Sequence, residues 1–153
     1  DRVKLRIPIF GDIILKVAIS RFTRTFGTLV AAGVSVLRAL EITADTAGNR
    51  AVAQVIEQAC TSVKEGEKIS DPMQGSTIFP LMVTQMISVG EETGRLDQML
   101  IKVSDFYESE VDSTLKGLAS LLEPVLIVFI GVLVGFIAVS VIAPIYALVG
   151  NIH

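Results

Sequence analysis

The chain has 153 residues and a mass of 16.4 kDa, which is enough for one domain of ordinary size. Charged residues make up only 19% and hydrophobic residues 51%, with a mean hydropathy of +0.63, which excludes a disordered chain and argues against an ordinary soluble domain. The single cysteine and histidine exclude a disulfide framework and a Cys/His zinc site, and the net charge of −3 argues against a broad basic nucleic-acid-binding surface.

Most of the chain shows apolar residues at helical spacing, in stretches separated by short turns. We expect Gly33 to end the first helix, Ser35 and Asn49 to cap the next two, and Gly66 to end the third. Short connections favour antiparallel neighbours, so the predicted fold is an all-α antiparallel bundle of about six helices. The expected helices cover residues 13–30, 36–44, 52–63, 80–89 and 96–115. Ser70-Asp71-Pro72 has the pattern of a cap plus a first-turn proline, which predicts a further short helix.

Two segments depart from this pattern. Residues 3–7 alternate between apolar and basic side chains and are the one candidate strand. The sequence GEETG at Gly90–Gly94 predicts a tight reversal before the last amphipathic helix. The first residue is Asp1 rather than Met, which indicates a processed product or a fragment of a longer protein.

The C-terminal part of the chain carries no Asp, Glu, Lys or Arg after Glu123. From Val125 to Ala143 every residue except Ser140 is apolar or glycine. About 20 such residues in a helix cross the hydrocarbon core of a bilayer, where a helix satisfies its own backbone hydrogen bonds. We therefore predict a C-terminal transmembrane helix; the alternative is a buried core helix of a soluble protein.

Basic residues indicate the orientation in the membrane. Lys116 precedes the apolar stretch, and no Lys or Arg follows it. Arg2, Lys4 and Arg6 would be the cytoplasmic flank of an earlier membrane helix, or else an exposed basic arm. The predicted organisation is a cytoplasmic helical bundle at residues 1–119, a transmembrane helix at 120–150 and a short non-cytoplasmic tail at 151–153.

Some residues of the predicted membrane helix favour contacts with other helices. Gly131 and Gly135 form a GxxxG pair, which lets another helix approach closely, although glycine is common in membrane helices without this role. Glu123 either reaches the water interface or pairs with a polar group of a neighbouring helix. Pro124 is expected at the helix entry, and Pro144 is expected to end or kink the helix.

The search for catalytic motifs is negative. The sequence contains neither a P-loop nor a G-x-S-x-G nucleophile elbow. Cys60 has no histidine partner on the predicted bundle, so we expect it to be a small packing residue, and His153 is a solvated end residue. We predict that the chain is not an enzyme and holds no cofactor.

Acidic residues form the one suggestive cluster, around the turn before the last amphipathic helix and along that helix. Glu91, Glu92 and Asp97 are candidates for binding a divalent cation, although their spacing fits no loop motif such as an EF-hand. The alternatives are a partner-docking surface and a solvated acidic face. The candidate partner-binding residues are Glu91, Glu92, Arg95, Glu108, Glu110 and Asp112.

Six segments occur in an order that resembles a known family: IPIFGDI, RFTRTFGTLVAAGVSVLRALEITADTAGN, VKEGEKIS, FPLMVTQMISVGEETGRLDQML, FYESEVD and LLEPVLIVFIGVLVGFI. The chain resembles the type II secretion and type IV pilus inner-membrane platform proteins (the GspF/PilC family). That family has two related cytoplasmic helical domains and three membrane helices. The resemblance covers the second domain and the last membrane helix.

The resemblance implies a non-enzymatic protein of the bacterial inner membrane, with its C-terminus in the periplasm, that couples a cytoplasmic hexameric ATPase to filament assembly. The implied partners are that ATPase, pilin or pseudopilin transmembrane helices, other inner-membrane assembly proteins and further copies of the chain, but no nucleic acid. Glu91 would cap a neighbouring helix or stay exposed at a partner surface. The competing interpretations are a tail-anchored adaptor or receptor without a motor partner and a membrane-bound metal-dependent enzyme. The residues that match the family pattern and look structural are Gly33, Phe79, Pro80, Gly90, Glu91, Gly94 and Leu96.

Overall fold

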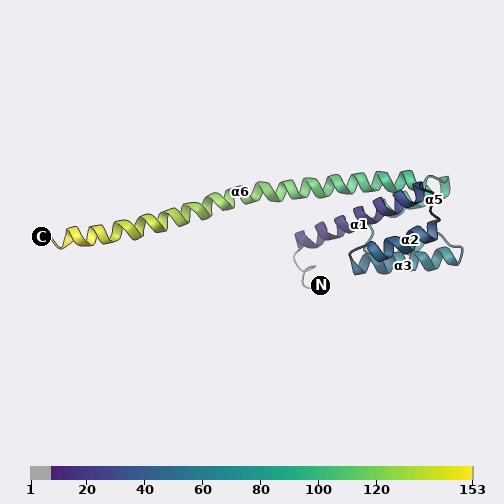
Figure 1. Cartoon of the computed structure of the whole chain (residues 1–153), viewed down its shortest axis with the longest axis horizontal. Helices are drawn as coiled ribbons and strands as arrows, with labels where there is room; N and C mark the ends of the chain where they lie inside the picture. Colours follow the sequence, from purple (N-terminus) through teal and green to yellow (C-terminus); the bar gives the residue numbers. More distant parts are fainter. Residues whose placement is uncertain (1–7, 153) are drawn as a thin grey trace. The chain divides into compact units, whose positions relative to one another are not determined.

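The computed structural model describes residues 8–152, with side-chain surroundings described from Phe10 onward. These residues form six α-helices and no strand, which confirms the predicted all-α fold; the candidate strand at residues 3–7 lies outside the described residues. The chain divides into two units, Asp1–Asp112 and Ser113–His153 (Figure 1). The helices are α1 (Pro8–Ala31), α2 (Val36–Thr46), α3 (Arg50–Lys64), α4 (Ser70–Gln74), α5 (Leu81–Thr93) and α6 (Leu96–Gly150).

Local signals set the ends of the first three helices. Gly33, after α1, has a φ of 86°, and Gly66, after α3, has a φ of 81°. The Ser35 side chain accepts a hydrogen bond from the backbone N–H of Arg38 and so caps α2. The Asn49 side chain accepts hydrogen bonds from two backbone N–H groups in the first turn of α3. These hydrogen bonds satisfy donors that a helix start leaves unpaired, and they confirm the predicted caps.

The core of the first unit lies between its helices. Figure 1 shows α2 and α3 side by side with α1 next to α2, and α4 packs against both α3 and α5. The ring centroid of Phe22 lies 5.6 Å from that of Phe26 and 5.6 Å from that of Phe79, which meets it edge-on. Phe79 is only 4% exposed, so the residue before Pro80 fixes the start of α5 to α1.

The first turns of α6 run antiparallel to α1. Lys16 pairs with Glu110, Ser20 accepts a hydrogen bond from the Ser104 hydroxyl, and Gly27 lies against Leu100. Residue numbers rise along α1 as they fall along α6, which is the antiparallel arrangement that the sequence predicted.

The predicted fifth helix and the predicted membrane helix are one helix of 55 residues. Pro124 lies inside α6 rather than at a helix entry, and Pro144 does not end α6, which continues to Gly150. The expectation for Pro124 was therefore wrong, and of the two roles expected for Pro144, ending the helix is contradicted. A proline removes one backbone hydrogen bond, whereas leaving the helix in an apolar segment would leave several backbone groups without partners, so the helix continues past both prolines.

Candidate functional site

The turn between α5 and α6 begins later than the sequence indicated. Residues Gly90–Thr93 remain helical, and only Gly94 adopts a left-handed conformation, with a φ of 69°. A Cβ atom on Gly90 would lie 2.8 Å from the Cα atom of Leu96, so only glycine allows the start of α6 to pass this close to α5. The predicted reversal over Gly90–Gly94 is therefore shorter than expected, and the acidic side chains in the last turn of α5 meet the linker between α3 and α4 and the start of α4.

Glu91 holds the start of α4. Its Oε1 atom accepts a hydrogen bond from the backbone N–H of Ile69 at 2.6 Å, and its Oε2 atom accepts one from Ser70 at 3.2 Å. A carboxylate is favoured at a helix N-terminus, where several N–H groups lack intrahelical partners. Ser70, predicted as the cap, is instead the first residue of α4, and its buried hydroxyl has no partner among the described residues. Of the two roles expected for Glu91, the structure gives it helix capping.

Glu92 binds the same segment through Lys68. Its Oε1 atom lies 3.0 Å from the Nζ atom of Lys68, and this hydrogen bond raises the pKa of that ammonium group. Asp97 lies in the first turn of α6, where a negative charge is favourable, and Arg95 is exposed beside Gly94. Glu91 and Glu92 thus each have a separate partner in the linker between α3 and α4.

Two of the other predicted acidic residues, Glu108 and Glu110, pair with basic residues of α1. The guanidinium of Arg24 donates to Glu108 at 2.6 and 2.9 Å and to Asp105 at 2.7 Å, and these hydrogen bonds raise its pKa, with Glu108 the larger cause. Glu110 lies 3.7 Å from the Nζ atom of Lys16. Asp112 is exposed at the end of the first unit. Ion pairs with α1 therefore occupy much of what the sequence offered as a free acidic face.

The described residues present neither a metal cluster nor an activated nucleophile. Within residues 8–152, no group of three or more His, Cys, Asp or Glu side chains is placed to hold a metal ion, so Glu91, Glu92 and Asp97 do not converge. Cys60 is buried on α3, as predicted, and burial raises the pKa of its thiol. A thiol with a raised pKa is a poor nucleophile at neutral pH.

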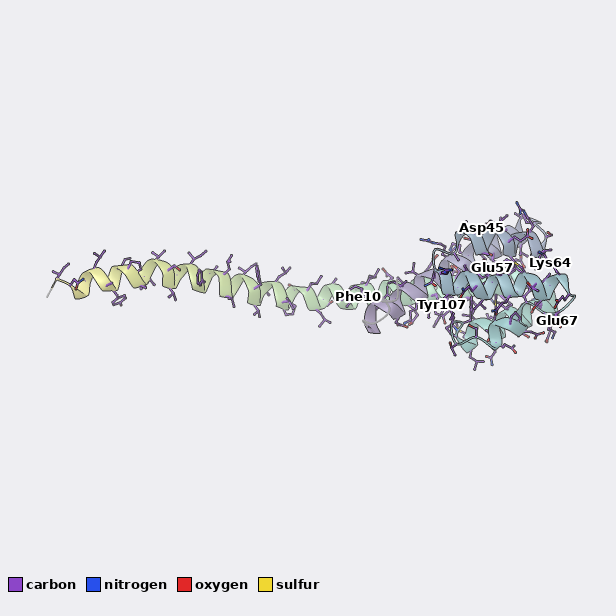
Figure 2. The ribbon with its side chains drawn as sticks, turned by 90° about the horizontal axis from the view of Figure 1, so that it is seen from below. Phe10, Asp45, Glu57, Lys64, Glu67 and Tyr107 are labelled. Atoms are coloured by element: carbon purple, nitrogen blue, oxygen red, sulfur yellow. The ribbon has the colours of Figure 1, made fainter. Side chains whose placement is uncertain are left out.

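A groove of about 390 Å³ lies at one end of the bundle, where the ends of α1, α3 and α5 meet the starts of α2 and α6. Three carboxylates line it, those of Glu67, Glu91 and Asp97, and no described lysine or arginine does. In Figure 2, Glu67 lies at the end of the bundle, on the same side as Lys64. The apolar lining comes from Val30, Val36, Val63, Ile69 and Leu96.

Sequence reasoning missed this groove, although the family-like segment VKEGEKIS contains three of its lining residues. Val63, Glu67 and Ile69 all belong to that segment. The signal available in the sequence was a turn with acidic residues that has an apolar residue, Val63 or Ile69, on each side. The remaining lining residues come from four other places in the chain, and only the fold brings them together.

The predicted helix-packing residues lie in the second unit, on α6. Glu123, Gly131 and Gly135 are all exposed, and a Cβ atom on either glycine would meet nothing within 4 Å. Ser140 donates its hydroxyl hydrogen bond to the carbonyl of Phe136, so its polar group is satisfied within the helix. Among residues 8–152, α6 is the one helix long and apolar enough to cross a membrane.

The last helix of the bundle continues into an apolar stretch long enough to span a membrane. The chain is therefore of the class of helical-bundle proteins with a C-terminal transmembrane helix. Residues 22–144 match the family "Type II secretion system (T2SS), protein F". The chain belongs to this family, which confirms the resemblance that the sequence segments indicated.

Curated relatives carry names from two kinds of assembly. The chain is 47% identical over 153 residues to "Type IV pilus assembly protein PilC" of Myxococcus xanthus and 42% identical over 153 residues to the protein of that name from Thermus thermophilus. It is 34% identical over 152 residues to "Type II secretion system protein F" of Xanthomonas campestris pv. campestris. These matches cover 100%, 99% and 99% of this chain but only 37%, 38% and 38% of those proteins. The chain thus spans under two fifths of the length of these relatives.

Proposed function

We propose that the chain is part of a non-enzymatic platform protein of the bacterial inner membrane that assembles type IV pili or type II secretion pseudopili. Membership of the protein F family and the names of the relatives support a role in such machinery. The observation that carries the proposal is α6, in which one helix holds both packed bundle residues and an apolar stretch of membrane-spanning length.

In this proposal residues 1–119 lie in the cytoplasm, residues 120–150 cross the membrane, and residues 151–153 reach the periplasm. The distribution of charge supports this orientation, because Lys116 precedes the apolar stretch and no Lys or Arg follows it. A cytoplasmic hexameric ATPase acts on the bundle. Pilin or pseudopilin transmembrane helices, other assembly proteins or further copies of the chain contact α6 near Gly131 and Gly135, where close approach is possible.

The mechanical step depends on the continuity of α6. An α-helix resists bending because backbone hydrogen bonds connect its successive turns, and a loop of the same length lacks these bonds. Movement that the ATPase imposes on Leu96–Asp112 therefore passes along the helix to the apolar stretch. The bundle itself does no chemistry in this scheme; it converts movement of a cytoplasmic motor into movement within the bilayer.

The test interrupts α6 in the full-length protein near the start of the second unit, before the apolar stretch. Gly117→Pro combined with Ser120→Pro removes two backbone hydrogen bonds, at a cost of about 3 kcal/mol for each proline. We expect piliation or secretion to fall to background while the variant still accumulates in the inner membrane. The matched control, Gly117→Ala with Ser120→Ala, keeps the helix and should assemble filaments normally. Normal assembly by the double-proline variant would contradict the proposal and favour a tail-anchored adaptor without a motor partner.

A further inference from the structure

We propose that the groove at the end of the bundle docks a segment of another assembly protein in which one apolar side chain is flanked by lysine or arginine. The groove lies wholly within the first unit, since its lining residues run from Val30 to Asp97. Its volume of about 390 Å³ is close to the lower end of the range of ligand sites, about 300–1,000 Å³, and suits one or two side chains.

The apolar part of the groove favours an apolar anchor. Val30, Val36 and Val63 are only half-buried, and they line the groove together with the buried side chains of Ile69 and Leu96. The three valines, from the ends of α1 and α3 and the start of α2, thus expose apolar surface at one place. Covering this surface with an apolar side chain removes it from water, which is the main favourable term in protein association.

The charge of the rim favours a basic partner. Glu91 lines the groove, but both of its carboxylate oxygens already accept hydrogen bonds at the start of α4. We therefore assign the binding of a cation to the other two carboxylates. Glu67 and Asp97 have no ion-pair partner among the described residues, so both are available to an incoming cation.

The nearby lysines do not cancel this charge. Lys68 is paired with Glu92 at 3.0 Å, and Lys64 lies 3.8 Å from Glu41. Neither lysine lines the groove, and Arg95 does not line it either. Complementary charge steers and orients a partner at a rim of this kind, so lysine or arginine beside the apolar anchor is the chemistry that fits.

This inference rests on the proposed function, because the partner is sought among assembly proteins. The experiment uses the full-length protein in lipid nanodiscs and an array of 15-residue peptides that tile the cytoplasmic parts of the pilus or secretion proteins of the same organism, this protein included. Peptides that bind are synthesised with a fluorescent label, and their dissociation constants are measured by fluorescence polarisation. We expect the binding peptides to contain an apolar residue flanked by Lys or Arg.

The decisive variant is Glu67→Lys with Asp97→Lys. It should weaken binding of these peptides by at least about tenfold, because two attractive contacts become repulsive. The matched control is Asp45→Lys with Glu57→Lys, which changes the net charge by the same amount at exposed positions outside the groove and should alter binding less than about twofold. In Figure 2, Glu57 lies nearer the middle of α3, whereas Lys64 lies at the end of the bundle where Glu67 is found.

A charge swap completes the test. Replacing the Lys and Arg residues of a binding peptide by Glu should abolish its binding to the unmodified protein and restore binding to the double variant, Glu67→Lys with Asp97→Lys. Glu67→Lys alone, in the linker between helices, is the second variant if the double variant loses its helical circular dichroism, and we expect about threefold weaker binding from it.

Several outcomes would overturn the inference. These are the absence of any binding peptide, equal loss of binding in the control variant, or unchanged binding in the groove variants. If only peptides from this protein itself bind, the partner is a second copy of the protein rather than another assembly protein, and the inference is wrong. The proposed coupling is tested separately, since normal filament assembly by the double-proline variant would leave a positive peptide result standing.

Discussion

The two parts of α6 show how one helix meets two different surroundings. In the first part Leu96, Leu100, Val103 and Tyr107 are buried, and Leu100 is 0% exposed. In the second part, which begins at Ser113, the large apolar side chains other than Leu118 are exposed in the isolated chain, and Leu133 is 51% exposed. Both parts are α-helical, so the difference lies in what covers the side chains.

The sequence pattern of each part explains this difference. The buried residues of the first part recur every three or four positions, so they form one stripe that faces the bundle, and the charged residues of this part lie outside that stripe. The second part is apolar on every side after Glu123. A stripe is covered by one neighbour, whereas a helix that is apolar all round needs an apolar solvent or several helices. Protein packing therefore stabilises the first part, and the membrane supplies that role for the second part in the proposed function.

The largest effect should come from shortening the same residue type in each part. Leu100→Ala opens a cavity in a packed core and should lower the free energy of unfolding of the bundle by about 2–5 kcal/mol. Leu133→Ala, the matched control in the second part, should change it by less than about 0.5 kcal/mol. Both variants are compared by urea unfolding of the full-length protein in detergent, followed by circular dichroism. Equal losses from the two substitutions would mean that the two parts do not differ as described.

A smaller effect is expected from adding one methyl group on α5 against the start of α6, and one methyl group on the second part of α6. Gly90→Ala places a Cβ atom 2.8 Å from the Cα atom of Leu96, and backbone cannot move aside cheaply. The clash outweighs the better helix propensity of alanine, so the net loss should be about 1–2 kcal/mol.

Gly117→Ala is the control for that substitution, because a Cβ atom there meets nothing within 4 Å. Alanine is the better helix former, so this variant should be unchanged or more stable by up to about 1 kcal/mol. Both values come from the same urea titration. A stable Gly90→Ala variant would show that α5 and α6 can separate without cost, and the tight turn would then not hold the start of α6.

Local chemistry made much of the fold predictable from the sequence. Ser35 and Asn49 cap helices through backbone groups two or three residues away, so their role is legible in the sequence itself. The apolar stretch after Glu123 was equally clear, because its length and composition are properties of one segment.

The rest depended on residues far apart in the chain. Ser70 looked like the cap of α4, yet the cap comes from Glu91, more than 20 residues later, and no local pattern contains that information. The acidic residues looked like one cluster, whereas Glu92 and Glu108 have partners in different helices or linkers. The groove was not predicted because its lining comes from the ends of five helices, and only their packing brings these ends together.

The smallest effect is expected at the cap of α4, next to the start of α6. Glu91→Gln removes the negative charge that accepts the backbone N–H groups of Ile69 and Ser70, and its amide can turn only one oxygen toward them. Losing a cap of this kind should cost about 1 kcal/mol. Glu92→Gln, the matched control, breaks an exposed ion pair with Lys68 and should leave unfolding unchanged.

Hydrogen exchange followed by mass spectrometry locates this effect along the chain. In Glu91→Gln the amides of Ile69 and Ser70 should exchange faster, because the carboxylate that protects them is gone. Exchange after Ser113 should match the unmodified protein, since the second unit makes no use of the cap. Faster exchange in both units would show that they unfold as one cooperative structure, which would contradict the contrast drawn between the two parts of α6. Faster exchange confined to the linker and α4 would show that one carboxylate from α5 holds the acidic end of the bundle in place while the apolar part of α6 remains independent of it.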